Sequence, residues 1–172
     1  MARIPDINPD TAGPELADLI ALVKRERGGQ VSALFRMLLN SPPICEGWIM
    51  MGSAVRFKAE VDGLARELAI CRIAQINKAD YEFHAHAPFV LKAGGTQPQL
   101  DELDRWREST LFSPALRATL ALTESMTSTL DADDALFAEV RSHYNERDTL
   151  ELVTTIGFYN MVSRVLRTMR VE

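Results

Sequence analysis

Hydrophobic residues recur at helical spacing in most segments of this chain. Between positions 64 and 74, one helical face carries four small or apolar side chains: Leu64, Leu68, Cys71 and Ala74. No segment shows a strand-like alternation bounded by hairpin turns, and the nearest exception, Leu152 to Thr155, lies inside a longer helical period. The pattern therefore predicts an all-α fold, a bundle of about eight helices.

Proline and glycine mark where helices are interrupted. Residues 1–13 contain Pro5, Pro9 and Gly13 among polar side chains, so we expect an irregular N-terminal arm. A length of 172 residues suits one domain with a sizeable core. We therefore expect a single helical domain over residues 14–172.

Capping residues predict several helix starts. Thr96 followed by Gln99 three positions later has the form of a capping box. Ser113, followed by a proline, marks another helix start. Asp131 and Asp148 are the predicted caps of the last two helices.

Composition limits the classes of partner and compartment. A hydrophobic fraction of 47% and a charged fraction of 25% are those of a soluble globular protein. The net charge of -5 argues against a nucleic-acid partner, because phosphate contacts need a basic surface. No stretch is apolar enough to span a membrane or to form a signal peptide, and two cysteines are too few for a disulfide framework. We therefore expect a cytoplasmic protein.

Two of the three histidines lie near acidic residues in the segment 66–86. Glu82 and His86 are four positions apart, so on a helix they share a face, and a carboxylate there can orient an imidazole as a general acid or base. A solvated surface pair is the plain alternative. Aromatic side chains flank the pair, which is unusual for a surface: Tyr81, Phe83 and Phe89.

A third candidate for this cluster is Glu67, on the preceding helix. If the two helices pack antiparallel, Glu67 can reach the face that carries Glu82 and His86. The alternative is a surface ion pair between Glu67 and Arg66 or Arg72. The spacing of these residues leaves both possibilities open.

Metal binding and cysteine chemistry have weaker support. Glu67, Glu82, His84 and His86 are ligand types that metals accept. However, His84 and His86 are two positions apart and point to different sides of a helix, so we expect no metal and no other cofactor. Cys71 is better explained as a small buried hydrophobic residue than as a nucleophile.

The same segment carries a family resemblance. The run from Arg66 to Ile70, the pair Ala74-Gln75, the pattern Tyr81-Glu82-Phe83-x-x-His86 and then Gly94 together resemble the carboxymuconolactone decarboxylase family, within the alkylhydroperoxidase D-like superfamily. The segments 39–42 and 156–160 also resemble that family, so the similarity covers roughly residues 15–170.

The resemblance implies which chemistry is retained. Redox-active members have a glutamate followed twelve residues later by a Cys-x-x-Cys-x-x-x-His motif, which places Glu67, Ala79, Glu82 and His86 at the four functional positions. Without the two cysteines, thiolate-based reduction of peroxide loses its nucleophile. The decarboxylase branch also lacks the cysteines, which implies lyase or isomerase chemistry by Glu67, Glu82 and His86. His86 would then be a proton donor, with Arg72 a possible partner for a substrate carboxylate.

Two other functions remain open. One is a peroxidase or disulfide-linked oxidoreductase in which Cys71 acts alone. The other is a ligand-binding or assembly protein without catalysis, since subunits of this superfamily form dimers, trimers or hexamers. An apolar group suits such an interface: Trp48, Met50, Met51 and Phe57. We therefore expect a small-molecule substrate and a homo-oligomer.

Overall fold

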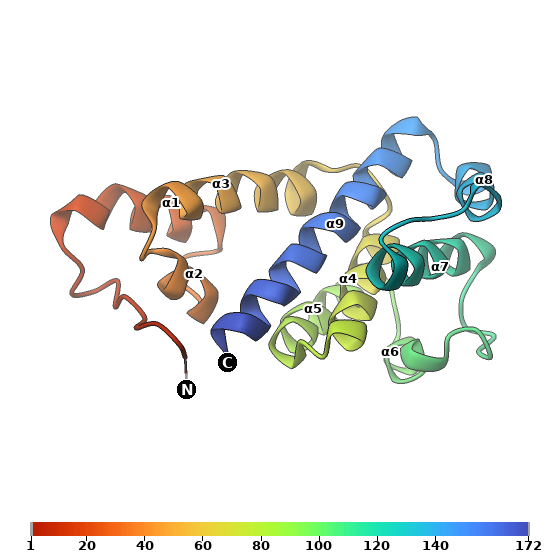
Figure 1. Ribbon diagram of the computed structural model, residues 1–172, viewed down its shortest axis with the longest axis horizontal. Helices are drawn as coiled ribbons and strands as arrows, with labels where there is room; N and C mark the ends of the chain where they lie inside the picture. Colours follow the sequence, from red (N-terminus) through yellow and green to blue (C-terminus); the bar gives the residue numbers. More distant parts are fainter. Residues whose placement is uncertain (1, 172) are drawn as a thin grey trace. The chain divides into compact units, whose positions relative to one another are not determined.

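A computed structural model describes residues 2–171, and every regular element in this range is helical (Figure 1). The elements, in chain order, are η1 (Pro14–Leu16), α1 (Ala17–Glu26), α2 (Ala33–Leu38), α3 (Pro42–Ser53), η2 (Ala54–Lys58), α4 (Gly63–Asn77), α5 (Asp80–Lys92), α6 (Gln97–Asp101), η3 (Leu103–Arg105), α7 (Pro114–Thr129), α8 (Asp134–His143) and α9 (Glu146–Met169). The predicted all-α class is confirmed, with nine α-helices in the described residues where about eight were expected.

The chain divides into two compact units. The first unit ends at Lys58 and takes in the chain again from Leu166, and the second is Ala59–Val165. In the first unit, α3 ends at Ser53, and a π-helical turn, η2, follows it.

The core of the second unit is built around α4. This helix packs against α5 and α7, and α7 packs against α8. Leu68, Ile70 and Ile73 are fully buried on α4, because apolar residues occupy several of its sides rather than a single stripe. The side chain of Asp62 caps the start of α4 by accepting a hydrogen bond from the backbone N–H of Ala65.

A tight turn joins α4 to α5. Lys78 ends α4 in the left-handed conformation, with φ of 55°, and Ala79 directly precedes the first residue of α5. A connection of two residues forces the helices to run antiparallel side by side. Residues at similar distances before and after this turn therefore face one another.

Buried polar groups connect three helices of the second unit. The side chain of Asn160 on α9 donates hydrogen bonds to the hydroxyl of Thr127 on α7 and to the carbonyl of Ile156. Its side-chain oxygen accepts a hydrogen bond from Asn77 at the end of α4. These bonds satisfy a buried amide and fix the position of α9 against α4 and α7.

The structure confirms two of the predicted caps and corrects two others. The capping box of Thr96 with Gln99 is present, and Ser113 accepts a hydrogen bond from the N–H of Leu116. The predicted caps at Asp131 and Asp148 were wrong, because Asp133 caps α8 and the side chain of Asn145 accepts the N–H of Asp148 at the start of α9. In both places another polar residue with a suitable side-chain oxygen stands nearby.

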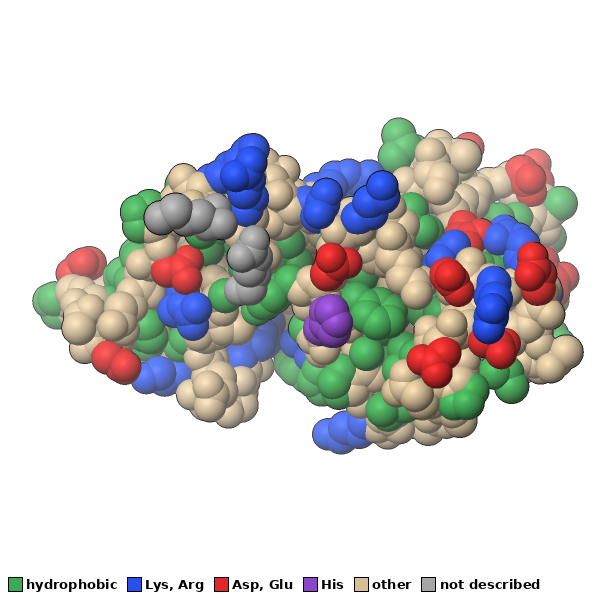
Figure 2. Space-filling model, turned by 90° about the horizontal axis from the view of Figure 1, so that it is seen from below, with side chains coloured by type: hydrophobic (Ala, Val, Ile, Leu, Met, Phe, Trp, Pro, Cys, Tyr) green, Lys and Arg blue, Asp and Glu red, His purple; other side chains and the backbone are tan. Residues whose placement is uncertain are grey.

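Among the described residues, no helix is both long enough and apolar enough to cross a membrane. On the face shown in Figure 2, acidic and basic side chains are mixed on the right, and basic side chains lie along the upper edge.

Candidate functional site

The antiparallel pair α4 and α5 brings Glu67 into contact with His86. Oε2 of Glu67 lies 2.7 Å from Nδ1 of His86, although the residues are 19 positions apart. Both side chains are buried, with 3% and 6% of their surface exposed. Arg66 also pairs with Glu67, at 3.3 Å between its Nε and Oε1. The two alternatives that the sequence left open, an ion pair with Arg66 and a contact with the Glu82–His86 face, are therefore both realised.

This pairing determines how His86 carries its proton. A carboxylate oxygen is an acceptor only, so Nδ1 of His86 donates the hydrogen bond to Glu67. In the neutral imidazole, Nε2 is then the basic nitrogen. Arg66 balances the negative charge of Glu67 in a place from which water is largely excluded. Glu67 can thus orient His86 and stabilise its imidazolium form when His86 accepts a proton.

Glu82 lies one helical turn before His86 on α5, but it has a different partner. Its Oε2 accepts a hydrogen bond of 2.9 Å from the hydroxyl of Ser163 on α9. The spacing of Glu82 and His86 predicted a hydrogen bond between them. In the structure, Glu67 rather than Glu82 makes the hydrogen bond to His86. The other oxygen of Glu82, Oε1, is buried and has no hydrogen-bond partner among the described residues.

The surroundings of Glu82 change its protonation. Burial raises the pKa of this carboxyl group from 4.5 to about 8, and the hydrogen bond from Ser163 offsets part of that effect. Glu82 is therefore mostly protonated at pH 7, whereas Glu67 is paired with Arg66 and His86. Two carboxyl groups in different protonation states is a common arrangement for acid–base catalysis.

Cys71 lies one helical turn after Glu67 on α4, and its thiol is fully buried. Burial is the largest cause of its raised pKa, and the ionised forms of Glu67 and Glu82 would raise it further. The thiol stays protonated at physiological pH, which makes it a poor nucleophile.

Aromatic rings contact His86. The ring of Tyr159 on α9 meets it edge-on, with centroids 4.9 Å apart and planes at 85°, and Phe89 contacts it at 5.9 Å. Phe158 in turn packs edge-on against Tyr159. Edge-to-face contacts of this kind restrict the rotation of the imidazole.

Other residues considered from the sequence lie outside this cluster. His84 is exposed, and its Nδ1 lies 2.8 Å from the carbonyl oxygen of Asp80. Arg72 pairs with Glu124 and also contacts Gln75, so it does not serve the cluster as a partner for a substrate carboxylate. Within residues 2–171, no three His, Cys, Asp or Glu side chains are grouped so that they could hold a metal ion.

Ser163 and Tyr159 are the members of the site that the sequence analysis missed as functional residues. Tyr159 lies in the segment 156–160, which carries part of the family resemblance, and Ser163 follows it by one helical turn. A serine on the buried face of a helix needs a hydrogen-bond partner, and this is the signal that could have identified it. Its partner is 81 positions away in the sequence, and no local pattern identifies it.

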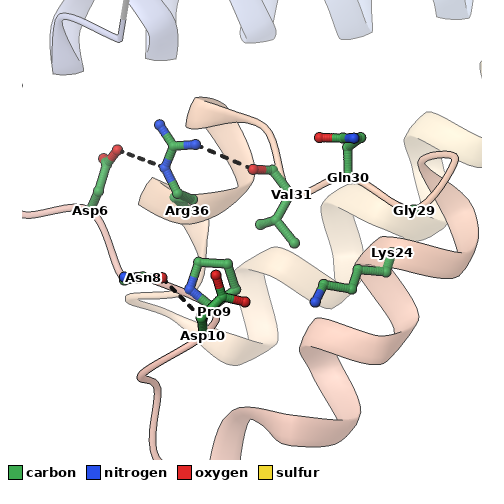
Figure 3. Close-up of a pocket in the computed structure, with 9 residues that line it drawn as sticks. All are labelled: Asp6, Asn8, Pro9, Asp10, Lys24, Gly29, Gln30, Val31 and Arg36. Atoms are coloured by element: carbon green, nitrogen blue, oxygen red, sulfur yellow. Dashed lines mark hydrogen bonds and ion pairs between the residues drawn. The ribbon is translucent and has the colours of Figure 1, made fainter.

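A pocket in the first unit is a weaker candidate. It has a volume of about 500 Å³ and is lined by Asp6, Asn8, Pro9, Asp10, Lys24, Gly29, Gln30, Val31 and Arg36 (Figure 3). Arg36 is already bound to Asp6 and to the carbonyl of Val31. The two aspartates are exposed, whereas Glu67, Glu82 and His86 are buried.

One known family matches part of the chain. Residues 42–125 match the model of the carboxymuconolactone decarboxylase family. This segment spans just under half of the chain. It contains Glu67, Glu82 and His86, and so carries the whole acid–base cluster except for the contacts from α9.

Similar proteins extend the comparison beyond this segment. The chain is 29% identical over 110 residues to the uncharacterized protein YdfG of Bacillus subtilis, an alignment that covers 63% of this chain and 75% of that protein. It superposes on an alkylhydroperoxidase AhpD core protein of Ralstonia eutropha, described as an uncharacterized peroxidase-related protein, with a TM-score of 0.83, 17% identity and coverage of 99% and 91% of the two chains. A cysteine-to-alanine variant of the debrominase Bmp8, in complex with 2,3,4-tribromopyrrole, gives a TM-score of 0.78 and 16% identity, with coverage of 100% and 93%. The fold is therefore alkylhydroperoxidase D-like.

The protonation of Glu82 predicts how the stability of the protein depends on pH. Between pH 4.5 and about 8, the unfolded chain releases the Glu82 proton while the folded protein keeps it, so the free energy of unfolding falls as the pH rises. Glu82→Gln removes this penalty. From pH 5 to pH 8, the variant should gain stability relative to the wild type by ~2–4 kcal/mol, measured by urea unfolding.

An exposed glutamate supplies the matched control for this measurement. Glu108→Gln removes a carboxyl group from the surface of the same unit, and its stability should follow that of the wild type at both pH values. If Glu82→Gln and the wild type had parallel pH profiles, the raised pKa of Glu82 would be wrong.

Proposed function

We propose that this protein is an enzyme that transfers protons on a small carbonyl compound, in an isomerase or lyase type of reaction. The observation that supports it is the buried hydrogen bond between Glu67 and His86, with the protonated Glu82 one helical turn away. His86 and Glu82 are the proposed catalytic residues, and Glu67 orients His86. The reaction needs no redox step and no cofactor.

The proposed reaction is an enolisation. Nε2 of His86 takes a proton from the carbon next to the carbonyl group, so a C–H bond breaks and an N–H bond forms. Glu82 gives its proton to the carbonyl oxygen, so its O–H bond breaks as the enol O–H forms. In a β,γ-unsaturated carbonyl compound, His86 then gives its proton to the γ-carbon while Glu82 takes back the enol proton, so the C=O bond re-forms and the C=C bond moves, which completes an isomerisation. Where the β-carbon carries a leaving group instead, the same electrons form the C=C bond and expel that group with its bonding electron pair, while Glu82 takes back the enol proton and the His86 proton is given to the leaving group, which makes the reaction a lyase. The Arg66–Glu67 pair stabilises the imidazolium in this dry environment.

The charges near the site favour an uncharged reacting group. Arg66 is paired with Glu67, and Arg72 is paired with Glu124. A substrate carboxylate at the reacting centre would lie beside the negative charge of Glu67 and would have to compete for these guanidinium groups. We therefore favour a ketone, aldehyde or lactone carbonyl over a carboxylate as the group on which the site acts.

Exchange of substrate protons with solvent tests this function without knowledge of the natural substrate. Small ketones, aldehydes and lactones are incubated with the protein in D2O, and deuterium uptake next to the carbonyl group is followed by NMR. His86→Gln and Glu82→Gln should each lower the exchange rate of an accepted compound about 10²–10⁴-fold, the usual contribution of a positioned acid or base.

His84→Gln is the matched control, because it removes an exposed histidine from the same helix and should leave the rate unchanged. Wild-type exchange rates in His86→Gln and Glu82→Gln would refute the assignment.

A thiol peroxidase is the second candidate, favoured by the peroxidase-related structural relative. At 17% identity, that likeness carries the fold alone. Against this function, Ala79 and Glu82 occupy the positions of the two cysteines of the redox-active relatives. Cys71 and Cys45 are free thiols, both buried, and burial raises the pKa of each, to about 11 for Cys45. Free buried thiols suit the reducing cytoplasm, the location that we propose and that cell fractionation tests.

The state of these thiols leads to a direct prediction. The native protein should react with a thiol reagent at least tenfold more slowly than the unfolded protein, and it should consume no hydrogen peroxide beyond a Cys71→Ser variant. Rapid labelling of Cys71 together with peroxide consumption that the Ser variant loses would favour the peroxidase instead.

We further propose that the protein forms a homo-oligomer through α3 and η2. The side chains of Met50 and Phe57 are 73% and 57% exposed, and Met51 and Ile44 are exposed beside them along the chain. Trp48, in contrast, is buried within its own chain. Large apolar side chains exposed along one segment are typical of subunit interfaces.

The mass in solution tests this assembly. Sedimentation of the wild type should give a multiple of 19.2 kDa, and the double variant Met50→Glu/Phe57→Glu should shift it towards that mass. A wild-type protein that sediments as a monomer at micromolar concentration would exclude the proposed assembly.

A further inference from the structure

We propose that Ser163 is a positioning residue for the acid at this site: its hydroxyl group holds the Glu82 carboxyl group so that the acidic proton is on Oε1, the oxygen that has no partner among the described residues. This inference rests on the proposed function, in which Glu82 gives its proton to a carbonyl oxygen. It adds a residue from α9 to a cluster otherwise built from α4 and α5.

The contact is well defined. Ser163 is fully buried, with 0% of its surface exposed, and its Oγ lies 2.9 Å from Oε2 of Glu82. Glu82 itself has 2% of its surface exposed. A buried hydroxyl and a buried carboxyl group at this distance form a hydrogen bond that water does not compete for.

The hydrogen bond makes the two oxygens of Glu82 different. A protonated carboxyl group has one carbonyl oxygen, which accepts, and one hydroxyl oxygen, which donates. In the arrangement we propose, Ser163 donates to Oε2 as it would to the carboxylate, so Oε2 is the carbonyl oxygen of the protonated group. The acidic proton is then on Oε1, which is buried and has no hydrogen-bond partner among the described residues.

A buried donor without a partner is costly. Leaving such a group unsatisfied in a folded protein costs roughly 1–3 kcal/mol, and buried polar groups normally have partners. The missing partner of Oε1 is supplied by a substrate oxygen that can accept a hydrogen bond. This requirement narrows the ligand to compounds with a carbonyl or enol oxygen, in agreement with the charges around the site.

Several groups face Glu82 and affect its ionisation. On α4 these are Cys71 and the negatively charged Glu67. Glu67 affects the pKa of Cys71 and is hydrogen-bonded to His86. His86 follows Glu82 on α5, and α9 contributes Ser163, with Tyr159 one turn earlier against His86. Ser163 donates a hydrogen bond to Glu82, so removing its hydroxyl group should make the carboxylate form less stable.

The experiment follows the titration of Glu82 by 13C NMR of its side-chain carboxyl group, identified by its loss in Glu82→Gln. In Ser163→Ala the midpoint should move upward by about half a unit to one unit, as expected for the loss of one hydrogen bond. In the deuterium-exchange assay, kcat should fall about tenfold with little change in KM, since the proton donor is misplaced while binding is largely kept.

Two other variants complete the test. Ser163→Thr keeps the hydroxyl group and should restore both the midpoint and kcat. Thr155→Val removes another buried hydroxyl group of α9, one that bonds to the carbonyl of Glu151, and should leave both unchanged. If Ser163→Ala does not fold, Ser163→Cys replaces it, because a thiol has a similar size and forms a weaker hydrogen bond. This variant should also raise the midpoint of the Glu82 titration.

The outcomes separate this inference from the proposed function. An unchanged or lowered midpoint in the serine variant overturns the role of Ser163, whatever the activity. A raised midpoint in a protein whose wild type exchanges no substrate protons leaves the contact with Glu82 intact and refutes the proposed function instead.

Discussion

The site depends on the hydrogen bond between Glu67 and His86 across the α4–α5 pair. It is formed in a region that water scarcely reaches, so solvent does not compete for the hydrogen bond. The turn at Lys78 and Ala79 keeps the helices antiparallel and in register for this contact. The apolar side chains buried on α4 exclude solvent from it.

The same buried region has the opposite effect on the protonation of Glu82. Glu67 has two cationic or hydrogen-bonding partners and can be ionised, whereas Glu82 has only the neutral hydroxyl of Ser163 among its described partners and stays protonated. One buried region thus holds a base and an acid at the same pH. The protein gives up stability to keep Glu82 there, which is common where a polar group serves function rather than folding.

Burial also governs the state of the thiol nearest to these residues. Ala79 is buried directly before α5, and Glu82 lies in the first turn of that helix. Cys71 on α4 is fully buried, and burial is the largest cause of its raised pKa. A buried thiol that stays protonated is a poor nucleophile.

The sequence by itself determined the helical class, because apolar spacing, prolines and caps such as Thr96 and Ser113 act within a few residues of themselves. It also indicated Glu67, Glu82 and His86, through helical spacing and through a family pattern. Only the tertiary structure decided that Glu67 binds His86 and that Ser163 binds Glu82, because contacts over 19 and 81 positions depend on how whole helices pack. The protonation of Glu82 was decided at the same level, since burial is a property of the assembled core and of no single segment.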